Sequence, residues 1–357
     1  MENRRLRDIR KLTGASDRRR IVAAFALSLV VWTPAVSGHH SNVEYDRDTV
    51  VEFEGETVSV LWRNPHVTVE VATTDESGET VVWSLEGAAV SSQRRRGVTD
   101  GLIAVGDRVR VAGFPSTRRP EHMLVEHLLL PDGVELLLGS TREPRWSERE
   151  VGSSEWTVDP ARASTDQASG ILRVWTRGRV RPWYFREAEE FELTEWAAAH
   201  AAEFDPFEDN PLLDCTPPGM PALMGNPYPM EFVETDRDIE LRFEEFDVVR
   251  MIHMDEADGG HDVAASPLGH SVGRWEGDTL VVATNRINWP HFGRVGIPQS
   301  ESVEVVERFT VVDEEDRLDY ELTITDPEVF AGSFTWEAHY NWRPGEVVGR
   351  YECTVEG

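Results

Sequence analysis

The chain has 357 residues, of which 36 are Lys or Arg and 65 are Asp or Glu, so its formal net charge at pH 7 is −29. This length is sufficient for two domains, each with its own hydrophobic core. The strong negative charge excludes nucleic acid and anionic lipid as partners of the surface, and it favours solubility in salt.

The first 38 residues have the features of an export signal. Eight basic residues precede an uncharged run at 21–36, which is shorter than the ~20 residues that a membrane-spanning helix needs. Cleavage after Ser37 or Gly38 would follow small residues, and "RRRIV" partly matches a twin-arginine signal. We therefore expect Sec or twin-arginine export to the periplasm or secretion, with an uncleaved anchor as the alternative. The cleaved chain would carry 28 basic and 62 acidic residues, a net charge of −34, and no stable membrane span.

Residues 39–138 are predicted to form an OB-like β domain. Alternating, β-branched segments at 50–62, 66–72 and 80–86 read as three strands. The segment 87–97 is helix-like and ends at a glycine, and further strands follow at 107–113, 122–130 and 134–138. Three strands, a helix and two or more strands is the element order of a five-stranded OB-type barrel.

A linker is predicted at 139–169, where hydrophobic periodicity is lost. Residues 170–357 then form a second domain that opens with a short helix capped by Thr194 and a proline-rich stretch at 209–230. From residue 231 onward, alternating segments joined by tight turns predict a larger antiparallel β-barrel or a sandwich. The predicted fold class is therefore mainly β, with short helices.

The two cysteines, Cys215 and Cys353, lie toward the two ends of this second domain. A disulfide between them suits an oxidising compartment and would contribute about 5 kcal/mol of stability in the chain-entropy model. Two unpaired thiols are the alternative.

Both halves resemble uncharacterised exported bacterial families. The first half carries "GHHSNVEYD", "RNPHVTVEV" and "VGDRVRVAGFP", which resemble a domain family with His-His-Ser after the signal and Asn-Pro-His after the first long strand. The second half carries "CTPPGMPALMGNPYPMEF" and "GHSVGRWEGDTLVV", which resemble another domain family of unknown function. These resemblances imply export and a β architecture, and they imply no chemistry.

The histidines of the first half are candidate metal ligands. Cleavage after Gly38 would leave His39 as the N-terminus, whose amine and imidazole could bind copper together with an imidazole from His66. Cleavage after Ser37 would instead give Gly-His-His, which binds Cu(II) through the amine, backbone nitrogens and His40. A solvated terminus, with the His66 ring merely hydrogen-bonded at a strand end, is the alternative.

A second group of histidines and acids is candidate catalytic machinery. His270, with Asp278 or His253, could act as a general base with an orienting carboxylate or hold a cation. Asp255, His261 and Asp262 lie in the same stretch, and a plain acidic surface loop is the alternative. "GHSVG" has the nucleophile-elbow spacing, but the hairpin that follows excludes Ser271 as a hydrolase nucleophile.

Aromatic side chains provide a third set of candidates. Most of the twelve tryptophans fall on or beside predicted strands, where core packing is their usual role. We expect Trp289 and His291, in a proline-broken loop, and Trp275 to contact a ligand at a barrel mouth.

Three function classes remain open. The first is an exported binding protein for a metal ion, with copper as the favoured ion, or for a small ligand. The second is an enzyme with a His/Asp site in the mouth of the second barrel. The third is an envelope interaction protein without a small-molecule site.

Overall fold

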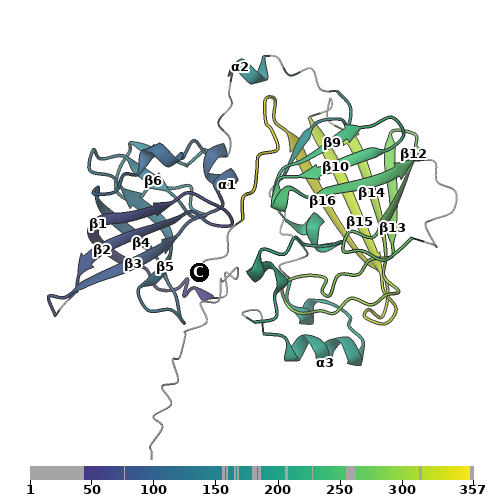
Figure 1. Cartoon of the computed structure of the whole chain (residues 1–357), viewed down its shortest axis with the longest axis horizontal. Helices are drawn as coiled ribbons and strands as arrows, with labels where there is room; N and C mark the ends of the chain where they lie inside the picture. The colour runs from purple at the N-terminus through teal and green to yellow at the C-terminus, as the bar shows by residue number, and fades with distance from the viewer. Residues whose placement is uncertain are drawn as a thin grey trace, which may run out of the picture. The chain divides into compact units, whose positions relative to one another are not determined.

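Two β-barrels make up the chain in the computed structural model (Figure 1). The structure describes residues 44–353 apart from 76, 155, 156, 158, 159, 165, 167, 168, 179–182, 184, 185, 206, 207, 227, 255–262 and 313–315. These residues all belong to one compact unit. The expectation of a mainly β fold with a small first barrel and a larger second one is confirmed.

The first barrel is five-stranded and has the predicted OB-type element order. Its strands are β1 (Val51–Leu61), β2 (Thr68–Thr74), β3 (Thr80–Glu86), β4 (Arg108–Pro115) and β5 (His122–Leu129). Four antiparallel pairings and one parallel pairing, β3 with β5, close the sheet on itself. Side-chain alternation explains the core, because Val69 and Val71 of β2 are fully buried whereas Glu70 between them is only partly buried.

A short helix, α1 (Val90–Arg95), follows β3 at the predicted place. It ends before Gly97, whose φ is +84°. Glycine adopts this left-handed conformation with little strain, so it is a common residue after the end of a helix. The helix α2 (Pro160–Ala163) comes later, and α3 (Glu195–Glu203) is capped by Thr194 as expected, since the Thr194 hydroxyl accepts a bond from the backbone of Ala197. No helix in the described ranges is long and apolar enough to cross a membrane.

The segment that follows the first barrel packs onto it. Strand β6 (Glu135–Leu137) pairs with β5, and the short β7 (Glu150–Val151) pairs with β6. The Glu135 side chain is fully buried and accepts hydrogen bonds from three consecutive backbone amides, those of Arg145, Trp146 and Ser147. Residues 139–151, which lie in the expected linker, are therefore held by hydrogen bonds that hydrophobic periodicity does not reveal.

The second barrel is closed by nine strands. They are β8 (Val174–Arg177), β9 (Met230–Glu234), β10 (Ile239–Phe243), β11 (Val249–Met254), β12 (His270–Glu276), β13 (Thr279–Asn285), β14 (Glu304–Val312), β15 (Arg317–Thr325) and β16 (Phe334–Trp342). Neighbouring strands are antiparallel except β11 and β12, which pair in parallel. This pairing is possible because the connection 255–269 is long enough for a crossover. Large aromatic side chains fill the interior, including the fully buried Trp175, Phe232 and Phe309.

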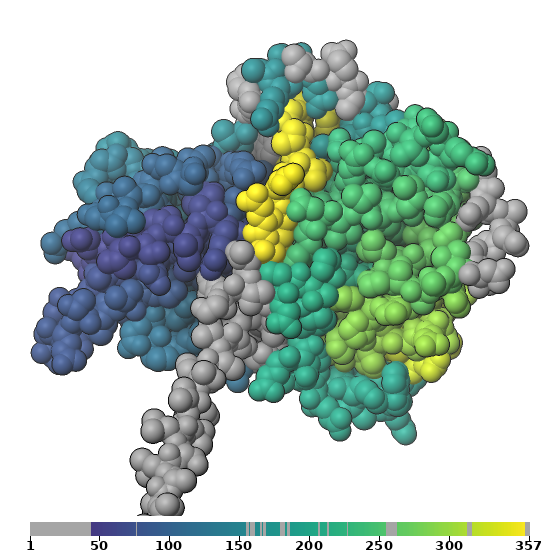
Figure 2. Space-filling view, in the orientation of Figure 1, coloured from purple at the N-terminus to yellow at the C-terminus, as the bar shows by residue number. Residues whose placement is uncertain are grey.

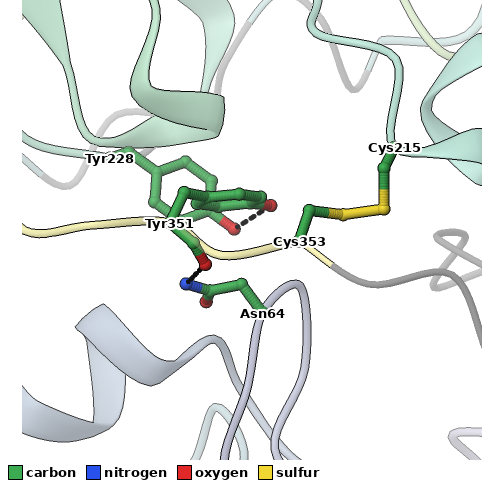
Figure 3. Close-up of a disulfide and its surroundings, with 5 residues drawn as sticks. All are labelled: Asn64, Cys215, Tyr228, Tyr351 and Cys353. Atoms are coloured by element: carbon green, nitrogen blue, oxygen red, sulfur yellow. Dashed lines mark hydrogen bonds between the residues drawn. A yellow bond between two sulfur atoms is a disulfide. The ribbon is translucent and has the colours of Figure 1, made fainter.

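The predicted disulfide between Cys215 and Cys353 is present. It joins the proline-rich stretch to the C-terminal segment, residues 343–353, which lies at the surface in yellow in Figure 2. Asn64 also holds this segment, because its side-chain amide donates to the Tyr351 carbonyl at 2.6 Å (Figure 3). The hydroxyls of Tyr351 and Tyr228 lie 3.3 Å apart beside the disulfide.

Candidate functional site

Ionisable side chains gather at one end of the first barrel around Glu86, the last residue of β3. The parallel pairing of β3 and β5 brings the first residue of β5, His122, to this end. One carboxylate oxygen of Glu86 lies 3.4 Å from His66 Nδ1, and the other lies 3.5 Å from His122 Nε2. The Tyr45 hydroxyl donates to that second oxygen at 2.8 Å. One buried carboxylate thus contacts two imidazoles and a phenol from three separate segments.

The charges around Glu86 keep it ionised. Burial alone would raise its pKa, but the neighbouring His66 and hydrogen bonds from His122 and Tyr45 lower the pKa to about 2. Burial, and then the Glu86 charge, raise the pKa of Tyr45, so its hydroxyl stays protonated. Arg119 supplies a further positive charge 3.6 Å from Glu86 and also binds the buried Glu44. The cluster is therefore a fixed set of charges and hydrogen bonds.

The His66 ring is held in place by a backbone carbonyl. Its Nδ1 lies 3.0 Å from the carbonyl oxygen of Gly87, which can only accept a hydrogen bond. We therefore assign the proton of the neutral ring to Nδ1 and the lone pair to Nε2. Metal-binding histidines are commonly held in this way by a carbonyl or a carboxylate. The ring is hydrogen-bonded at a strand end, so this contact also fits the purely structural interpretation.

A cavity of about 300 Å³ adjoins this cluster. From the first barrel and its loops, the lining includes Pro65, His66, Glu86, Ser91 and Arg95. From the rest of the compact unit, the lining includes Tyr228, Glu245, Phe246, Arg294 and Tyr351. The size lies at the lower end of small-molecule sites, and the mixture of aromatic rings with a few charged groups is typical of them.

The described residues supply only part of the predicted copper site. His39 and His40 lie outside them, so the structure places only His66 of the three expected ligands. Within the described ranges, no group of three or more His, Cys, Asp or Glu side chains is arranged to hold a metal ion. A metal site at His66 would therefore take further ligands from outside the described residues, where the predicted ligands His39 and His40 lie.

The structure brings together two of the three predicted catalytic residues. The rings of His253 and His270 stack with centroids 4.9 Å apart, because β11 and β12 pair in parallel. Asp278 lies in the turn after the far end of β12, about 20 Å along the strand from His270. The carboxylate beside His253 is instead Asp238, 3.3 Å from Nδ1. Asp255, His261 and Asp262 lie outside the described residues.

The predicted ligand-binding aromatics are also separated. Trp289 is buried and His291 is partly buried beyond the end of β13, where the His291 ring meets Phe204 edge-on at 4.9 Å. Burial lowers the pKa of His291, which favours its neutral form. Trp275 lies near the β12–β13 turn at the other end of these strands, with 49% of its surface exposed. Only Trp289 and His291 therefore share one end of the barrel.

Several groups in the cluster and the cavity carry no signal in the sequence. Glu86 and His122 become neighbours only through strand pairing, and Arg95 and Glu245 are single charges among many. Tyr45 belongs to the "GHHSNVEYD" motif, so a closer look at that motif could have identified it.

Comparison with known proteins gives a family match for one part of the chain. Residues 27–123 match a family of unknown function, DUF6152, which agrees with the resemblance to an uncharacterised domain family. No curated protein and no solved structure matches the chain. The resemblance of the second half to another family stays a prediction.

Proposed function

We propose that the protein is an exported binding protein whose first barrel holds a metal ion, with copper as the first candidate, at His66. The observation that supports the proposal most directly is the His66 ring, which lines a cavity and is held through Nδ1 by Gly87. This tautomer would present Nε2 as the ligand atom, and the Glu86 carboxylate, 3.4 Å from Nδ1, helps to hold the ring in place. Imidazole nitrogens of this kind suit Cu(II).

His39 and His40 complete the proposed site. The amine and imidazole of His39 would bind beside His66 after cleavage at Gly38, whereas His40 would take part after cleavage at Ser37. Export is part of the proposal, since the basic and apolar leader precedes these histidines and the disulfide suits an oxidising compartment. A bound copper ion would supply Lewis-acid or redox chemistry at the cavity.

The test is a copper titration of protein that has been exported through its own signal and kept free of tags. We expect near-stoichiometric Cu(II) binding, and we expect His66→Ala to weaken it by more than about tenfold, the smallest usual cost of losing a residue that only supports a metal ligand. The matched control is His200→Ala, which removes an exposed imidazole from α3 and should leave the affinity unchanged. Equal affinity of the wild type and His66→Ala would contradict the proposal.

A second candidate function, catalysis at the second barrel, is favoured by the contact between His253 and Asp238. A histidine oriented by a carboxylate is the usual arrangement of a general base. If this site hydrolyses esters, turnover of 4-nitrophenyl acetate should fall at least about a hundredfold in His253→Ala and stay constant in His200→Ala. Equal rates in the wild type and His253→Ala would contradict catalysis of this reaction at His253.

A further inference from the structure

The cavity beside His66 has an unusual charge for this chain. The whole protein carries 65 acidic and 36 basic residues, yet three arginines, Arg47, Arg95 and Arg294, line the cavity. Two glutamates also line it, but burial raises the pKa of Glu245 to about 8, so this side chain is mostly neutral at pH 7. Among the side chains that line the cavity, arginines therefore outnumber ionised carboxylates, a balance that favours an anionic ligand.

Two polar groups of α1 at the cavity have unused hydrogen-bonding capacity. Ser91 is 3% exposed, and its hydroxyl has no hydrogen-bond partner within the part of the chain that the structure describes. Nη1 of Arg95 has no hydrogen bond there either, and it lies 3.8 Å from Oε1 of Glu346, which likewise has none among the described residues. Burial raises the pKa of Glu346 to about 7, so this carboxyl only partly balances the arginine charge. Buried polar groups are normally satisfied, so the Ser91 hydroxyl, in a residue that lines the cavity together with Arg95, is a group that a ligand could satisfy.

The other side of the cavity is aromatic. The rings of Phe246 and Tyr351 lie 4.5 Å apart, and Tyr228 meets Tyr351 edge-on at 5.3 Å. All three line the cavity, together with the apolar Leu124 and Leu212. Such a wall favours a flat, apolar group, because aromatic rings pack against one another in offset or edge-on contacts.

From this arrangement we propose that the cavity binds a small aromatic carboxylate, with the carboxylate at Arg95 and Ser91 and the ring against Phe246 and Tyr351. A guanidinium and a hydroxyl satisfy the oxygens of a carboxylate, and a cavity of about 300 Å³ limits the ligand to roughly a single ring with a short side chain. The inference does not rest on the copper proposal, since neither Arg95 nor Ser91 is a ligand of the proposed metal site.

The test uses the mature, full-length protein, freed of metal with EDTA and dialysed, and isothermal titration with benzoate, phenylacetate and 3-phenylpropionate. We expect saturable binding of at least one of these acids. The uncharged amide of that acid should bind at least about tenfold more weakly, because it forfeits a charge-assisted hydrogen bond. Absence of saturable binding for all three acids, or equal binding of acid and amide, would overturn the proposal.

Variants locate the binding within the cavity. Arg95→Gln should weaken binding at least about tenfold, and Ser91→Ala should weaken it severalfold. Arg94→Gln removes the same charge from the preceding residue of α1, which is exposed and does not line the cavity. This variant should bind the acid with the affinity of the wild type. Melting curves verify that each variant is folded. If Arg94→Gln and Arg95→Gln lose affinity equally, the assigned position is wrong. Copper titrations of the same variants keep the two proposals separate, because Arg95→Gln should weaken binding of the acid without removing a ligand of the proposed copper site, so it should not lower copper affinity.

Discussion

Glu86 makes the stability of the first barrel depend on pH. Its folded pKa of about 2 lies below the ordinary value of 4.5, so the ionised side chain stabilises the fold above about pH 4.5. This stabilisation is lost as the pH falls from there toward 2, because the unfolded chain takes up the proton first. The difference between these two pKa values corresponds to up to about 3 kcal/mol of stability.

We therefore predict that Glu86→Gln flattens the acid branch of the stability curve. Between about pH 5 and pH 2, the free energy of unfolding should fall more for the wild type than for the variant, by up to about 3 kcal/mol. Urea unfolding at a series of pH values measures this difference. Glu79→Gln makes the same change at an exposed position of the same strand hairpin, and we expect it to follow the wild-type curve. Parallel curves for the wild type and Glu86→Gln would show that Glu86 has no special role in acid stability.

At the scale of elements, one buried ion pair ties the strands of the second barrel together. Arg250 of β11 forms two hydrogen bonds with Glu307 of β14, and both side chains are almost fully buried. The guanidinium also donates to the hydroxyls of Ser271 on β12 and Thr284 on β13. The hydroxyl of Tyr320 on β15 donates to the Glu307 carboxylate. Five consecutive strands thus share one network, which explains why Ser271 is a structural residue in the interior.

Because this pair is buried, we predict that replacing one partner lowers the free energy of unfolding much more than replacing both. Glu307→Leu should lower the free energy of unfolding by about 3–5 kcal/mol, because it leaves a buried guanidinium without its partner. Replacing both residues, Arg250→Met with Glu307→Leu, should recover much of that loss. The control is Arg308→Met, which breaks the exposed pair with Glu276 and should cost less than about 1 kcal/mol. If Glu307→Leu costs no more than this control, the network is not a source of stability.

The elements also show what sequence reasoning can reach. Local alternation and turn residues predict most strands, α1 and the cap of α3, because these depend on neighbouring residues. The clusters depend on strand pairing between distant segments, as with Glu86 and His122, or with His253 and His270. The many acidic residues also make such pairs hard to predict, because Glu307 is one of 65 and its neighbours in sequence do not distinguish it. Asp278 is close to His270 in sequence but lies at the other end of the strand, so proximity in sequence misled the prediction.

At the scale of the whole molecule, the C-terminal segment connects distant parts of the chain. The backbone amide of Gly349 donates to Glu244, and the Tyr351 carbonyl accepts from Asn64, 287 positions earlier in the sequence. The disulfide fixes the end of this segment to Cys215. Tyr351 also lines the cavity, so the same segment contributes both to stability and to the proposed ligand site.

The disulfide therefore carries the last prediction, for the double variant Cys215→Ser with Cys353→Ser. Closing a loop over a sequence separation of 138 restricts the unfolded chain, so the variant should lose up to about 5 kcal/mol of unfolding free energy. Its melting temperature should be lower than that of the oxidised wild type and should not respond to dithiothreitol. The wild type, in contrast, should approach the melting temperature of the variant when it is reduced. If the variant holds Tyr351 less firmly, the binding of any ligand that packs against this ring should also be weaker. A wild-type melting curve that is identical with and without reductant, once thiol titration has shown the bond to be broken, would mean that the noncovalent contacts of Asn64, Glu244 and Tyr228 hold the segment by themselves.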